Sequence, residues 1–150
     1  MQENFHSKVR FVVPRYGEEV VGGIESLVKN MAENLAKNGW EVVVITSTAT
    51  SEHTWNPYFD SGLSIINDVQ VRRFDVLHSR NPKLFSSFSR IFFHLPKDFR
   101  PEQLWYRFQG PYIPEILEVL SKDPNIPTIF APYLYFPTVY GIRLPNIHKI

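Results

Sequence analysis

The chain has 150 residues, a formal net charge of +1 and no cysteine. This length allows one domain with a hydrophobic core, and 43% hydrophobic with 21% charged residues is typical of a globular protein. The near-neutral charge gives no reason to expect a nucleic-acid partner, and the lack of cysteine excludes disulfides, thiolate metal sites and cysteine nucleophiles.

No apolar run reaches the roughly 18–20 residues of a membrane-spanning helix. The first residues, MQENFHSK, lack the apolar stretch of a signal peptide. We therefore expect a cytoplasmic protein.

The N-terminal third of the chain predicts a strand, a loop, a helix and a second strand. Residues 9–13 form a short run rich in β-branched residues that ends at Pro14, as in a buried parallel strand. Residues 41–46 predict the second strand. Between them, apolar residues recur with the spacing of one buried helix face at Ile24, Leu27, Val28, Met31 and Leu35. The region therefore predicts a right-handed βαβ unit.

Residues 64–66 and 70–74 predict a β-hairpin that turns at Asn67 and Asp68. Amphipathic spacing then predicts helices at 84–95 and 103–108. A further helix is expected to begin at Gly110-Pro111, with Ile113, Ile116, Leu117 and Leu120 on its buried side.

A short strand at 127–131 and a helical turn within 133–140 follow. This order of elements predicts an α/β fold, namely a doubly wound Rossmann-like parallel sheet with an inserted β-hairpin. The last residues, NIHKI, resemble the start of another strand. We therefore expect residues 1–150 to be one truncated domain of a larger protein.

Gly22 and Gly23 stand where the first helix begins, directly after a buried strand and its loop. Helix N-termini present unpaired N–H groups and a partial positive charge, so this is where α/β proteins bind phosphates. The glycine spacing fits neither a dinucleotide fingerprint nor a P-loop. A purely structural interpretation, in which the glycines permit tight helix–strand packing, is equally open.

The segment FVVPRYGEEVVGGIESLVKNMAENLAKNGWEVVVIT resembles the N-terminus of retaining GT-B glycosyltransferases of the family 4 type. That family has a strand, P-x-x-G-G-x-E, a helix ending L-x-x-x-G-H-x-V and a strand ending in Thr. The matching residues are Pro14, Gly22, Gly23, Glu25, Leu35, Gly39, Val42 and Thr46, although the loop between Pro14 and Gly22 is longer than in this pattern, and Trp40 replaces the usual His. The segments NDVQVRRF, FQGPYIPEILEVL and PYLYFPTVYG also resemble later parts of such domains.

The resemblance implies an enzyme that moves a sugar from a nucleotide-sugar to a sugar or lipid-linked acceptor with retention. It implies that this chain is the acceptor-binding half, that a C-terminal donor-binding domain is missing, and that the chain alone is inactive. In the family the Gly-Gly loop faces the donor diphosphate, which assigns that contact to the amides of Gly22, Gly23 and Ile24.

Further residues expected at the acceptor side or in the cleft are Arg15, Tyr16, Thr46, Ser47, Tyr133 and Tyr135. Thr46 and Ser47 end the second strand, where open α/β sheets bind ligands. The two later tyrosines offer stacking faces to a sugar, and packing is the alternative role. No catalytic residue is assigned. His53 and His78 are weaker acceptor-side candidates.

No metal or other cofactor is predicted, because the nucleotide-sugar is a substrate. The five histidines lack ligand spacing, and a D-x-D motif is missing.

Residues 83–100 interleave aromatic and basic side chains, a pattern that fits a helix lying on an anionic membrane surface. This predicts peripheral contact with the inner face of the membrane. The alternative, which we favour because so aromatic a domain needs core material, is that the Phe stripe packs on the sheet.

Two rivals to the transferase remain open from the sequence. One is a non-catalytic α/β binding or scaffolding domain, and the other is a different α/β enzyme such as a phosphate-binding epimerase or phosphatase.

Overall fold

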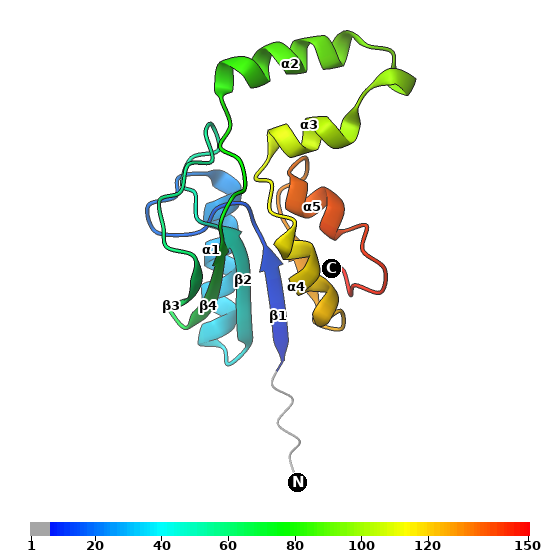
Figure 1. Ribbon diagram of the computed structural model, residues 1–150. Coiled ribbons are helices and arrows are strands. Elements are labelled where there is room, and N and C mark those ends of the chain that lie inside the picture. The colour runs from blue at the N-terminus through cyan, green and yellow to red at the C-terminus, as the bar shows by residue number, and fades with distance from the viewer. Residues whose placement is uncertain (1–6) are drawn as a thin grey trace.

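Parallel strands form the centre of the sheet in the computed structural model, which describes residues 7–150 (Figure 1). β1 (Lys8–Val12) pairs with β2 (Glu41–Ser47), and β2 pairs with β4 (Val69–Phe74). β5 (Thr128–Phe130) pairs in parallel with the other side of β1, and β3 (Gly62–Ile66) pairs antiparallel with β4. The order β3-β4-β2-β1-β5 confirms the Rossmann-like α/β fold and its inserted hairpin.

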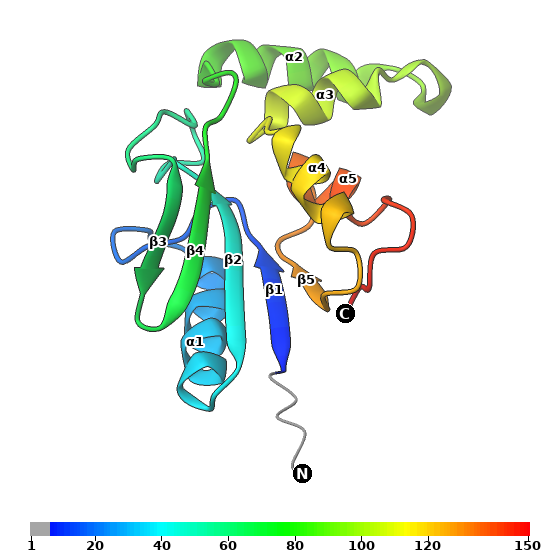
Figure 2. The same ribbon diagram turned by 60° about the horizontal axis from the view of Figure 1, so that its bottom comes forward.

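One face of the sheet is covered by α1 (Gly23–Lys37), which connects β1 to β2 (Figure 2). Val28 and Ala32 of the helix are buried against strand residues such as Phe11 and Val44. The predicted apolar stripe is wider than the buried one, because Ile24, Leu27 and Met31 are exposed. These three residues flank the line along which the helix contacts the sheet, and this corrects the expectation that the whole stripe is core.

The opposite face is covered by α4 (Glu115–Lys122), with α5 (Phe136–Gly141) beside it. Ile116 and Leu120 pack on Val12 and Ile45 of the sheet. The helix begins at Glu115 rather than at Gly110-Pro111 as expected. Proline at position 114 disfavours helical backbone at the residue before it, which delays the start.

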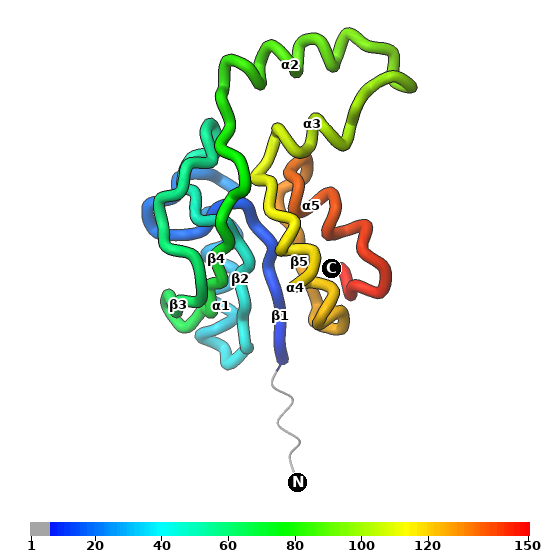
Figure 3. The backbone as a smooth tube through the Cα atoms, in the orientation of Figure 1, coloured from blue at the N-terminus to red at the C-terminus, as the bar shows by residue number. Residues whose placement is uncertain are grey.

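α2 (Pro82–His94), η1 (Lys97–Phe99) and α3 (Glu102–Gln109) form a helical hairpin, residues 82–109, between β4 and α4. The chain leaves the sheet for this hairpin and returns from it in Figure 3. The side chain of Asn81 caps α2 by accepting from the amides of Lys83 and Leu84.

The Phe stripe of α2 packs on α3 and not on the sheet. Phe92 stacks on Trp105 with ring centroids 5.6 Å apart, and Trp105 Nε1 donates to Ser89 Oγ at 3.0 Å. The expectation that this stripe contacts the sheet is therefore wrong. Pro96 and Pro101 interrupt the helical pattern, so that the following helix folds back and covers the stripe.

Arg10 lies in the interior strand β1 and is only 2% exposed. Its Nε donates to Thr128 Oγ1 and its Nη2 to the carbonyl oxygen of Asp123, both at 3.1 Å. The guanidinium thus links β1 to β5. Thr128 also bridges Lys149 in parallel, at the place where the sequence resembles the start of a strand.

Across residues 7–150, every helix is too short or too polar to span a bilayer.

Candidate functional site

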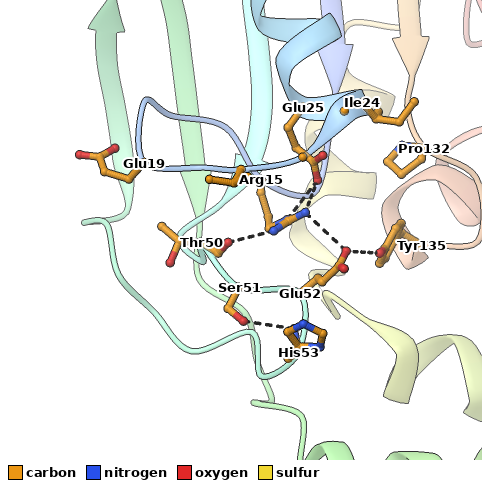
Figure 4. A pocket seen from close by; sticks show the side chains of 13 residues that line it. Arg15, Glu19, Ile24, Glu25, Thr50, Ser51, Glu52, His53, Pro132 and Tyr135 are labelled. Atoms are coloured by element: carbon orange, nitrogen blue, oxygen red, sulfur yellow. Dashed lines mark hydrogen bonds and ion pairs between the residues drawn. The ribbon is translucent and has the colours of Figure 1, made fainter.

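A pocket of about 560 Å³ opens at the carboxyl edge of the sheet (Figure 4). Its walls come from the loop after β1 with the start of α1, from the loop after β2, and from the loop after β5. The connection from β1 runs to β2 on one side, whereas β5 lies on the other side of β1. The strand order therefore reverses at this pocket, and such a switch point is where open α/β sheets bind ligands.

Arg15 connects two walls of the pocket through its guanidinium. Its side chain is only 9% exposed, and its Nε and Nη2 donate to Glu25 Oε1 at 3.1 and 2.6 Å. Nη1 donates to the carbonyl oxygen of Thr50 at 3.0 Å, and Nη2 lies 3.4 Å from Glu52 Oε2. The guanidinium therefore fixes the start of α1 against the loop after β2.

Tyr135 closes the pocket on the β5 side. Its hydroxyl donates to Glu52 Oε2 at 2.8 Å. Burial raises the pKa of Tyr135 to about 12, and the hydrogen bond to Glu52 and the negative charge of that carboxylate act in the same direction. Trp55 meets the Tyr135 ring edge-on at 5.6 Å. The phenol therefore stays protonated at neutral pH and orients the Glu52 carboxylate.

The first turn of α1 forms another wall. Gly22 precedes the helix, and no side chain caps it. A Cβ at Gly22 would overlap the carboxylate of Glu25, whereas a Cβ at Gly23 would meet no atom within 4 Å. Gly22 thus leaves room for the Arg15–Glu25 pair, and Gly23 leaves the helix N-terminus open to the pocket. The N–H groups of an uncapped first turn favour an anion.

The charged side chains that line the pocket are mostly acidic. They comprise three glutamates, Glu19, Glu25 and Glu52, and a single guanidinium, that of Arg15. Carboxylates accept hydrogen bonds, so these walls suit a ligand that carries hydroxyl groups. The pocket therefore combines a wall for hydroxyl donors with a helix N-terminus for a negative group.

The structure brings together part of the expected set. Gly22, Gly23, Ile24, Arg15 and Tyr135 line the same pocket, and His53 joins them.

Tyr16, Thr46 and Ser47 are buried and do not line the pocket, contrary to expectation. Tyr16 packs in the core under α1, and Ser47 Oγ donates to the carbonyl oxygen of Pro14 at 2.6 Å. The chain after β2 folds back over the end of that strand, where the amides of Tyr58 and Phe59 donate to the carbonyl oxygen of Thr48. The contribution of this connection to the pocket therefore comes from residues 50–53 and not from the strand end.

Tyr133 is exposed but is not among the residues that line the pocket, whereas Tyr135, two positions later, is. His78 lies elsewhere and stacks on Tyr112 with ring centroids 5.9 Å apart. Glu52 was not anticipated from the sequence, although an acidic residue shortly after a predicted parallel strand is a signal for a ligand contact.

Within residues 7–150 no cluster of three or more His, Asp or Glu side chains is arranged to hold a metal ion. Comparison of the chain with protein-family models, with curated proteins and with solved structures finds no match.

Proposed function

We propose that this chain is the acceptor-binding domain of a glycosyltransferase, which moves a sugar from a nucleotide-sugar to an acceptor with retention. The observation that carries the proposal is one pocket at the switch point of the sheet, lined by the open start of α1 and by carboxylate side chains. The resemblance of residues 11–46 to GT-B transferases supports the same assignment.

The anionic part of the donor would meet the first turn of α1. The amides of Gly23 and Ile24 have the partial positive charge of a helix N-terminus, and no side chain occupies the space at Gly23. Charge that develops on a leaving diphosphate is stabilised by such preorganised N–H groups. The other donor contacts would come from a C-terminal domain, as the resemblance implies.

The acceptor would meet the opposite walls. Glu52 is fixed through Oε2 by Tyr135 and Arg15, and its side chain remains 40% exposed. An acceptor hydroxyl can therefore donate to the remaining lone pairs of this carboxylate. In this role Glu52 orients a sugar hydroxyl, and Tyr135 is a positioning residue.

The electrostatics of the pocket favour one second candidate, a carbohydrate-binding domain without catalysis. Arg15 is the single Lys or Arg among the lining residues, and its donors are taken by Glu25, Thr50 and Glu52. Such a pocket suits neutral polyols better than a diphosphate.

The test is release of nucleoside diphosphate from a panel of nucleotide-sugars by the natural protein that contains this domain. Gly23→Val should lower turnover about 100-fold by blocking the helix N-terminus, the magnitude typical for loss of one oxyanion contact. Because position 23 is open, the variant should keep its melting temperature. Ser26→Val, an exposed change one turn further along α1, is the matched control.

Unchanged turnover in Gly23→Val would remove the phosphate role. Saccharide binding without any release of nucleoside diphosphate would instead assign the pocket to the non-catalytic binding domain.

A further inference from the structure

We propose that the helical hairpin, residues 82–109, docks on the surface of an anionic lipid bilayer. Six large apolar side chains of the hairpin have exposed fractions between 42% and 76%, namely Leu84, Ile91, Phe93, Phe99, Leu104 and Phe108. Single exposed apolar residues are ordinary, but so many on one small projecting unit mark an interaction surface.

Part of this apolar surface is continuous along one flank of the hairpin. Leu84, Phe88 and Ile91 recur at the spacing of one helix face, beside the face that packs on α3. Phe108 of α3 meets Phe88 with ring centroids 5.4 Å apart. Leu84, Phe85, Phe88 and Phe108 together line a groove of about 340 Å³. This flank can therefore bury apolar area against a partner.

Positive charge is concentrated on the same unit. The hairpin contains five basic and two acidic residues, a formal charge of +3, so the rest of the chain is at −2. None of the five basic side chains forms an ion pair within residues 7–150. Arg107 lies at the apolar groove, and Lys83 and Arg90 lie on the exposed side of α2. An anionic headgroup layer complements this arrangement.

The charge also argues against a second copy of this chain as the partner. A symmetric dimer through the hairpin would place +3 against +3, and like charges oppose such a contact. Long basic side chains can instead reach headgroups while their neighbours enter the acyl boundary.

The position of the hairpin fits a bilayer. It projects beyond the carboxyl ends of the strands, the end of the sheet at which the site pocket opens (Figures 1 and 2). Docking would hold that edge of the domain near the lipid surface. The inference stands on the hairpin alone and does not depend on sugar transfer.

Co-sedimentation of the chain with lipid vesicles tests the inference. We expect binding to mixed phosphatidylcholine–phosphatidylglycerol vesicles and little binding to pure phosphatidylcholine. The double variant Leu84→Ser/Ile91→Ser should weaken binding about tenfold or more through loss of apolar burial. Lys83→Gln/Arg90→Gln should also weaken binding to the anionic vesicles, more so at low salt.

The matched controls lie on α1. Leu27→Ser changes an apolar residue that is 54% exposed, and Lys37→Gln removes an exposed charge, so neither should alter vesicle binding. Three results would each overturn the inference: no binding to the anionic vesicles, equal binding to both compositions, or hairpin variants that bind like the controls. A concentration-dependent dimer that the hairpin variants abolish would assign the surface to a second copy instead.

Discussion

The hydroxyl of Tyr135 and the guanidinium of Arg15 meet on the same carboxylate oxygen, Glu52 Oε2, at 2.8 and 3.4 Å. Tyr135 follows β5, Arg15 follows β1 and Glu52 follows β2. Three loops from separate parts of the chain are thus joined at one atom, and the shape of the pocket depends on that junction.

The stability of the fold should depend on the protonation of Tyr135. An unfolded tyrosine has a pKa of about 10, and burial together with Glu52 raises the pKa of Tyr135 to about 12 in the folded chain. The unfolded state therefore loses its proton first, and the contribution of Tyr135 is complete below about pH 10 and lost as pH rises toward about 12.

Between about pH 10 and pH 12, the free energy of unfolding measured with urea should fall less steeply in Tyr135→Phe than in the unmodified chain. Part of the pH dependence should remain in Tyr135→Phe, because burial also raises the pKa of Tyr16 to about 12. Identical pH profiles for variant and unmodified chain would contradict the assignment.

The two adjacent glycines should respond differently to alanine. Gly22→Ala forces the Glu25 carboxylate away from Arg15, and we expect a loss of about 1–3 kcal/mol. Gly23→Ala enters open space in the first helical turn, and stability should stay equal or rise by up to about 1 kcal/mol. Chemical denaturation of both variants measures the difference. Equal losses at both positions would be inconsistent with the packing described.

Arg15→Met should be strongly destabilising, because it leaves the Glu25 carboxylate nearly buried and unpaired. The side chains are 9% and 10% exposed, and breaking such a pair costs about 3–5 kcal/mol. Arg15→Met/Glu25→Leu should recover much of the loss. The exposed pair Lys8–Glu41 provides the control, since Lys8→Met should cost about 1 kcal/mol or less. A double variant no better than the single one would show that the pairing is not the cause.

Arg80 should stabilise the loop that follows β2, at residues 50–55. Its guanidinium donates to the carbonyl oxygens of Glu52, His53 and Gln109, and it ties the loop after β2 to the end of α3. In Arg80→Ala we expect faster amide hydrogen exchange at residues 50–55. Arg80→Lys should restore this protection only in part, because an ammonium lacks the planar fork. Arg90→Ala, an exposed change on α2, should leave exchange in that loop unaltered.

The elements that sequence predicted well are those specified by near neighbours. The turn of the β-hairpin follows from Asn67 and Asp68, which adopt the left-handed backbone that such a turn requires, at φ of 49° and 66°. The pattern of α2 likewise indicates that one face is buried. It does not indicate which surface covers that face, because periodicity is a property of one helix and the choice of α3 over the sheet depends on distant residues.

The site was predicted in part for the same reason. Gly22 and Arg15 lie in the segment between β1 and α1, where local order alone places them at the sheet edge. The prediction that Thr46 and Ser47 lie in the site was wrong, because the accessibility of a strand end depends on how the next loop folds over it. Glu52 gains its role from Tyr135, a contact across 83 positions that no local pattern encodes.

The buried Arg10 favours one register in the pairing of β5 with β1. If β1 were shifted by one residue, its guanidinium would turn toward the apolar side chains under α1 and lose both Thr128 and the Asp123 carbonyl. A strand of three residues would otherwise discriminate weakly between alignments. One cation inside the sheet therefore penalises a misaligned strand.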